Sequence, residues 1–210
     1  TSSVADMSLM FRGADIATPT TTSWNVSSVT DMTGMFRNAP YANPNTSGWN
    51  VSNVTTMKEM FKEADLANPD TSSWVTTSLT STEAMFQDAA IANPDTSGWD
   101  TSSITIMRYM FDGATSANPD TSGWDTSNVS SMSYMFNDAT SADPDTSSWD
   151  TSGASFYANM FNGSGIDAGN YSKFLIMAGE CLAEITPCSR PENATIGNIG
   201  DGSVDYYTGD

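Results

Sequence analysis

The sequence predicts an α/β solenoid of stacked 25-residue coils, each a short parallel β-strand plus a short α-helix, with a C-terminal cap. Two observations support this fold class. The sequence aligns with itself at a shift of 25 residues, without an insertion, from residue 1 to about residue 161. Each unit carries apolar residues at the same places, which is typical of coils that bury one face against their neighbours. We therefore divide the chain into a repeat solenoid of about six and a half units, residues 1–161, and a C-terminal cap, residues 162–210.

Large apolar residues recur with this period and form a predicted core ladder. Its members are Trp24, Trp49, Trp74, Trp99, Trp124 and Trp149, Met10, Met35, Met60, Met85, Met110 and Met135, and Phe11, Phe36, Phe61, Phe86, Phe111 and Phe136. We expect each side chain to pack on its own copy in the neighbouring coils, because a buried aromatic side chain removes about 150–250 Å² from water. Exposed tryptophan rows can bind sugars, but the regular spacing favours a core.

The elements within one unit follow from spacing and turn residues. Val129, Met132, Met135, Phe136 and Ala139 lie at helical spacing and predict one apolar stripe of a short α-helix. Ser127 or Asn128 is suited to cap its first turn. The Asn-Pro-Asp segment at 118–120 predicts a turn, and the Thr-Ser-Gly-Trp segment at 121–124 predicts a brief strand.

The predicted outer face of the helices has no fixed pattern. Its residues include Lys58, Glu59, Lys62 and Arg108. Charged side chains without a period are typical of a solvated face, and we assign them no role.

Composition limits the function. Seven Lys plus Arg against 25 Asp plus Glu give a net charge of −18, which would repel nucleic acids and anionic membrane surfaces. No apolar stretch is long enough to insert into a membrane. Histidine is absent, and we find no nucleophile, phosphate loop or metal constellation, so we expect no enzyme activity. The remaining partners are cations, basic surfaces and neutral ligands such as glycans.

Polar residues also recur once per coil, in columns beside the core, and each column has more than one possible role. Asp70, Asp95, Asp120 and Asp145 repeat once per coil; they either form local turn hydrogen bonds or are candidate Ca²⁺ ligands, and we expect no other cofactor. Threonine also recurs once per coil at two positions, which we call the threonine files, and these rows make ice binding a less favoured alternative function. The files comprise Thr46, Thr71, Thr96, Thr121 and Thr146, and Thr76, Thr101, Thr126 and Thr151.

Cys181 and Cys188 either form a disulfide that closes the cap or remain a reduced pair. We also expect a terminal strand or hairpin in residues 194–209.

The repeat "TSGWDTSNVSSMSYMF" at 121–136 resembles those of BspA-like leucine-rich-repeat surface proteins, whose pattern is W-[DN]-[VT]-S-x-V-x-x-M-x-x-M-F. The resemblance covers about three quarters of the chain and implies an LRR-like fold. The chain departs from it where Thr96 and its copies replace an aliphatic residue.

The resemblance also implies a function and a location. It implies a secreted or cell-surface module that recognises or adheres to host or neighbouring-cell surface proteins or glycans. The alternative is a structural spacer, or a subunit that associates head to tail into an extracellular fibre.

Overall fold

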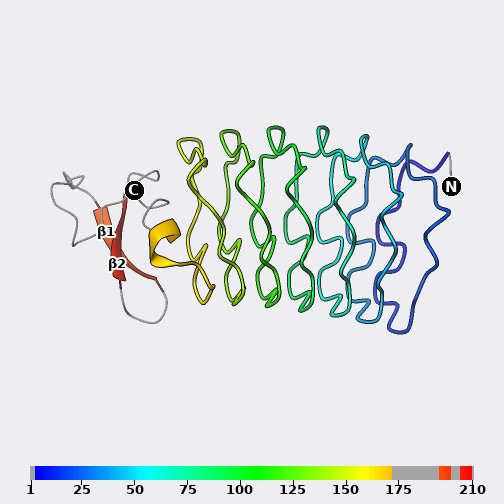
Figure 1. The fold of residues 1–210 in the computed structure, drawn as a ribbon, viewed down its shortest axis with the longest axis horizontal. Helices are drawn as coiled ribbons and strands as arrows, with labels where there is room; N and C mark the ends of the chain where they lie inside the picture. The colour runs from blue at the N-terminus through cyan, green and yellow to red at the C-terminus, as the bar shows by residue number, and fades with distance from the viewer. Residues whose placement is uncertain (1–2, 172–193, 200–203, 210) are drawn as a thin grey trace.

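The computed structural model describes residues 3–171, 194–199 and 204–209. The repeated part of the chain winds into coils that stack in a row along the long axis of the molecule (Figure 1). We number the coils 1 to 7 by their Met-Phe pairs, from Met10-Phe11 in coil 1 to Met160-Phe161 in coil 7.

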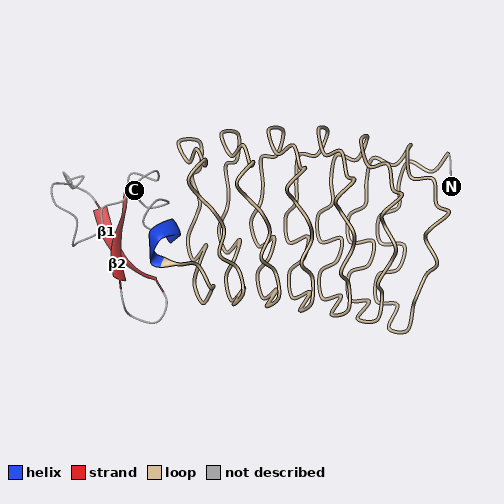
Figure 2. Ribbon diagram, viewed as in Figure 1, coloured by secondary structure: helices blue, strands red, loops and turns tan. Residues whose placement is uncertain are grey.

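The prediction of a strand and an α-helix in every coil is wrong. The coils consist of turns and irregular backbone (Figure 2). Within the described residues, regular structure is confined to a helical turn at 168–171 and to the strands β1 (Ala194–Ile199) and β2 (Val204–Gly209). The α/β solenoid class is therefore corrected to a stack of turn-built coils.

Coil 2 shows why the helical spacing does not produce a helix. The N–H groups of Met35, Arg37 and Ala39 donate to carbonyls three residues earlier, at distances of 3.1 to 3.2 Å. Gly34 and Asn38 have φ of 58° and 53°, which a right-handed helix cannot contain. Apolar residues about three apart therefore point inward at successive β-turns instead of along one face of a helix.

Hydrogen bonds between coils replace those that a helix would form within itself. In coil 2 the N–H groups of Gly34, Phe36 and Asn38 each donate to a carbonyl of coil 3 at 2.8 Å. The predicted strand segment is also a turn, since the Trp49 N–H donates to the Thr46 carbonyl at 3.0 Å.

Isolated parallel bridges join the coils elsewhere, and we call the bridged residues the bridge column. Its members are Asp6, Asp31, Thr56, Ser81, Ile106, Ser131 and Phe156.

The core ladder lies along the axis of the coil stack. Its phenylalanine rings stack from each coil to the next with centroids 5.4 to 5.5 Å apart from Phe11 to Phe136. Tryptophan rings stack in pairs at 6.1 to 6.2 Å. The ladder residues of coils 2 to 6 are buried, whereas in coil 1 Met10 is 45% exposed and Phe11 and Trp24 are half-buried.

The threonine files are also buried, so they offer no surface to ice. Thr96 is fully buried, and its hydroxyl donates to the Asp120 carbonyl of the next coil at 2.7 Å. Thr71 and Thr121 form the same bond to Asp95 and Asp145. These hydroxyls join consecutive coils from inside the stack.

The C-terminal region contains a pair of antiparallel strands, which confirms the strands predicted in residues 194–209. β1 pairs with β2 from Ala194 opposite Gly209 to Ile199 opposite Val204. Cys181 and Cys188, which we predict to form either a disulfide or a reduced pair, both lie outside the described residues.

Candidate functional site

One partly exposed face of the coil stack differs from coil to coil. It consists of the bridge column and of the residues two and three positions after each bridge residue, and we call it the bridge face. These residues are Thr56, Lys58 and Glu59 in coil 3; Ser81, Glu83 and Ala84 in coil 4; Ile106, Arg108 and Tyr109 in coil 5; Ser131, Ser133 and Tyr134 in coil 6; and Phe156, Ala158 and Asn159 in coil 7. The core positions repeat, so the bridge face is one place where a coil can acquire an individual property.

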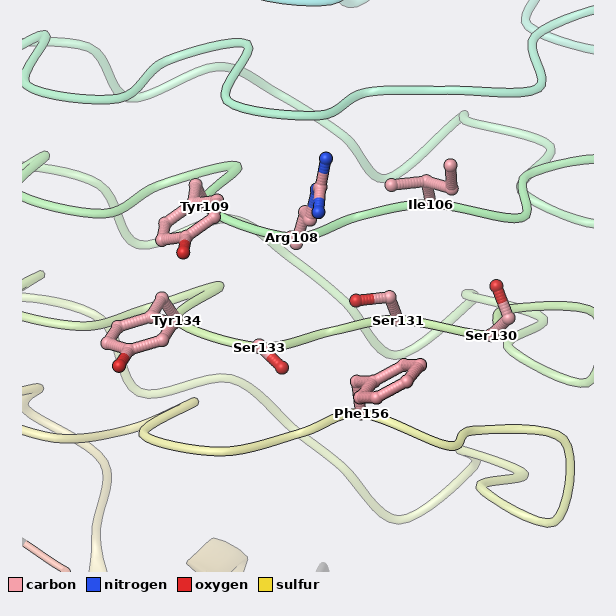
Figure 3. A pocket seen from close by; sticks show the side chains of 8 residues that line it. All are labelled: Ile106, Arg108, Tyr109, Ser130, Ser131, Ser133, Tyr134 and Phe156. Carbon is pink, nitrogen blue, oxygen red and sulfur yellow. The ribbon is translucent and has the colours of Figure 1, made fainter.

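A pocket opens on the bridge face over coils 5 to 7. Its volume is about 400 Å³, and it is lined by Ile106, Arg108, Tyr109, Ser130, Ser131, Ser133, Tyr134 and Phe156. In Figure 3 the two tyrosines lie on one side, Ile106 and Phe156 lie on the other, and Ser131 and Ser133 lie between them. The volume falls at the lower end of the range of about 300–1,000 Å³ that is usual for small-molecule sites.

Aromatic side chains form the walls of this pocket. The Tyr109 and Tyr134 rings stack with centroids 5.1 Å apart and an interplanar angle of 15°. Phe156 is 64% exposed, so most of its ring is accessible to a ligand. The positions equivalent to Tyr109 in coils 2, 3 and 4 hold Gly34, Glu59 and Ala84, so the tyrosine pair belongs to this pocket alone among the described coils.

The tyrosines occupy an unfavourable backbone conformation. Both have φ of 60°, in the left-handed region that glycine adopts without cost and other residues adopt at roughly 1–2 kcal/mol. Gly34 occupies the same position in coil 2 with φ of 58°. The equivalent residues Leu9, Glu59, Ala84 and Asn159 have φ of 52° to 57°, so this conformation belongs to the turn of every coil and does not single out the pocket.

A row of charges keeps the Arg108 side chain away from the serines. Arg108 Nη2 lies 2.8 Å from Glu83 Oε1, and Lys58 Nζ lies 3.2 Å from Glu83 Oε2. The Glu83 side chain is only 13% exposed, so it is well shielded between the two cations. Arg108 extends toward coil 4 in Figure 3, which leaves the space over Ser131 and Ser133 open.

The aspartates considered as Ca²⁺ ligands are engaged in local hydrogen bonds. Asp95 Oδ1 accepts the Ser97 N–H at 3.0 Å and the Ser97 hydroxyl at 2.7 Å. Asp70 and Asp120 accept the same pair of bonds from the serines two residues later, and Asp145 accepts the Ser147 N–H. In residues 3–171 no group of three or more acidic or cysteine side chains is arranged to hold a metal ion. The structure therefore places these carboxylates in turns.

Because these turns contain hydrogen-bonded aspartate carboxylates, we expect acid to destabilise the protein. Hydrogen bonds from Ser97 lower the pKa of Asp95 below 3.8, and Ser72 and Ser122 have the same effect on the pKa of Asp70 and Asp120. A pKa that is lower in the folded state contributes stability above the unfolded pKa, and this contribution is lost as the pH falls through the folded value. We expect the melting temperature to fall progressively below about pH 5.

Replacing the serine tests this pH dependence. Ser97→Ala removes the hydroxyl bond, so we expect the pKa of Asp95 to rise and the melting curve to depend less steeply on pH between 5 and 2. Ser73→Ala is the control, because the Ser73 hydroxyl donates to the Ser47 carbonyl and to no carboxylate. Equal slopes for both variants would contradict the assignment.

The pocket is not among the sites predicted from the sequence. Lys58, Glu59 and Arg108 lie on the bridge face and form ion pairs, with Glu59 bonded to Arg37, instead of covering the outside of helices. Tyrosine at the same repeat position in two consecutive units, Tyr109 and Tyr134, was the available signal. The predicted core ladder does not contribute to the pocket.

The fold and the pocket define a repeat protein of stacked turn-built coils with a pocket on its bridge face. The chain belongs to the family described as Mycoplasma protein of unknown function, DUF285, whose family model matches residues 1–99 and residues 85–174. A search of curated proteins gave no match, and neither did a search of solved structures. Among the described residues, no helix has the length and apolar character to cross a membrane.

Proposed function

We propose that this chain is a non-catalytic recognition module and that its ligand binds in the pocket on coils 5 to 7. The observation that carries the proposal is the clustering of Tyr109, Tyr134 and the exposed Phe156 around open serine side chains. Exposed aromatic side chains around a hollow are costly to leave in water and are enriched at binding surfaces.

Some positions of the 25-residue unit keep the same residue in every coil and others vary, and this difference supports the proposal. The buried ladder holds successive coils in a constant arrangement, with phenylalanine rings 5.4 to 5.5 Å apart through coil 6. Side chains on the bridge face therefore project from a rigid support. A rigid support lowers the entropy that is lost when a ligand binds.

The partners and location follow from charge and from the BspA-like resemblance. The net charge of −18 disfavours nucleic acids and anionic membranes. We propose a secreted or cell-surface protein that binds surface proteins or glycans of a host or a neighbouring cell. A spacer or a self-stacking fibre subunit would not require an open aromatic pocket.

The direct test is an array that carries glycans and extracellular proteins, probed with the whole chain. We expect specific binding by the wild-type chain and a loss of at least tenfold for Tyr134→Ala, because truncating an aromatic anchor commonly costs about 2 kcal/mol or more. Tyr41→Ala is the matched control, since Tyr41 is 57% exposed and lies in coil 2, away from the pocket.

The proposal fails if the wild-type chain binds nothing on the array. It also fails if Tyr134→Ala and Tyr41→Ala bind as well as the wild-type chain. Thermal unfolding monitored by circular dichroism verifies that both variants are folded.

A further inference from the structure

We infer that the pocket takes an uncharged saccharide, which stacks on Phe156, and that Glu83 sets this preference by holding Arg108 away. This inference rests on the proposed function, since it names the ligand class of the same pocket. Three features of the lining carry it: its hydroxyl groups, its exposed ring and its paired charges.

Hydroxyl groups dominate the polar lining. Ser130, Ser131, Ser133, Tyr109 and Tyr134 each present one. Ser130 donates its hydroxyl proton to the Thr105 carbonyl at 3.0 Å, which leaves its lone pairs to accept. The hydroxyls of Ser131 and Ser133 have no hydrogen-bond partner within the described part of the chain. A hydroxyl both donates and accepts, so this set matches the hydroxyls of a sugar without favouring either charge.

Phe156 supplies the apolar surface. It lies in the bridge column of coil 7, where its backbone carbonyl accepts the Met132 N–H at 2.7 Å, while its ring is 64% exposed. In Figure 3 the ring lies beside Ser131, at the edge of the pocket. One face of a pyranose ring presents C–H groups, which pack on the negative face of an aromatic ring while the sugar hydroxyls point toward polar partners.

The charges argue against an anionic ligand. Arg108 is the one ionised side chain in the lining, and its guanidinium bonds Glu83 at 2.8 Å. A free guanidinium would bind a carboxylate or sulfate through two parallel hydrogen bonds. With Arg108 bound to Glu83, the pocket lacks that receptor, and the acidic chain as a whole repels anions.

The experiment compares matched neutral and sulfated probes on the full chain. Cello-oligosaccharides and N-acetylglucosamine oligomers are the neutral probes, and heparin-derived oligosaccharides are the sulfated probes, with binding measured by calorimetry and saturation-transfer NMR. We expect the wild-type chain to bind a neutral probe and Phe156→Ala to bind it at least tenfold more weakly. Ile91→Ala is the control, because Ile91 is an exposed apolar residue outside the pocket.

Two further variants test the role of Glu83. We expect Glu83→Gln to release Arg108 and to raise affinity for the sulfated probe at least fivefold. Lys58→Gln is the control: Lys58 lies outside the pocket lining and its loss keeps the Arg108–Glu83 pair, so affinity for both probes should stay within twofold of wild type. Unchanged affinity of Glu83→Gln for the sulfated probe would overturn the role of Glu83, and Glu83→Asp repeats the test if Glu83→Gln does not fold.

The remaining outcomes separate this inference from the proposed function. A wild-type preference for the sulfated probe overturns the inference, and so does saccharide binding that Phe156→Ala leaves unchanged. If the chain binds no saccharide but binds a protein on the array in a Tyr134-dependent way, the saccharide inference is overturned and the recognition function stands.

Discussion

Phe111→Ala is expected to lower the free energy of unfolding by about 3–5 kcal/mol, the cost usual for removing a fully buried phenylalanine. Phe111 is completely buried, and its ring stacks on Phe86 at 5.5 Å and on Phe136 at 5.4 Å. Alanine would leave a cavity between two coils whose spacing is fixed by the rings above and below, so the site cannot collapse to fill it. Urea unfolding followed by circular dichroism measures the loss.

Phe11→Ala is the matched control for this prediction. Phe11 is half-buried and stacks on Phe36 at 5.4 Å and on Trp24 at 6.0 Å, in coil 1 at the end of the described stack. We expect a clearly smaller loss, because a coil in a row gains stability from each neighbour that it contacts. Equal losses for the two variants would show that the aromatic ladder does not couple the coils.

The 25-residue period carried most of the information about packing. Each core residue packs on the identical residue 25 positions away in the chain, as the stacking of Phe86, Phe111 and Phe136 shows. Spacing within the unit was a weaker guide, since inward residues about three positions apart fit both an α-helix and a series of β-turns. The left-handed backbone at Tyr134 and Asp138 separates these two structures; tyrosine does not indicate it, and aspartate indicates it only weakly.

A signal for the turns was nevertheless present in other units. Glycine occurs at Gly34, at the position of Tyr134, and at Gly113, at the position of Asp138. Their φ values of 58° and 70° are those for which glycine is best suited. Glycine at these two repeat positions in other units therefore predicts left-handed residues there, which excludes a helix.

The pocket could be predicted only in part. The tyrosine pair follows from the period, but the open space beside it depends on which way the Arg108 side chain turns. Glu83 and Lys58 determine that direction, and both belong to other coils. Such a choice depends on side-chain conformations that a repeat pattern does not specify.

Thr96→Val is expected to destabilise the protein by about 1–3 kcal/mol, although valine has the same shape and is more apolar. Transfer free energy alone predicts the opposite sign, because Thr96 is completely buried. The hydroxyl of Thr96 donates to the Asp120 carbonyl at 2.7 Å and so joins coil 4 to coil 5. Valine would leave this carbonyl without the donor, and the cost of an unpaired polar group exceeds the gain from one methyl group.

Thr105→Val isolates the role of burial in this effect. The Thr105 hydroxyl also donates to a carbonyl of the preceding coil, Thr80 O, at 3.2 Å, but Thr105 is exposed. Water can replace that bond, so we expect a change within about 0.5 kcal/mol, as at ordinary surface positions. Urea unfolding of the two variants compares them directly. If Thr96→Val proved neutral or stabilising, the buried threonines would be apolar fillers, equivalent to the aliphatic residues of the BspA-like repeats, and the hydrogen bonds between coils would contribute little.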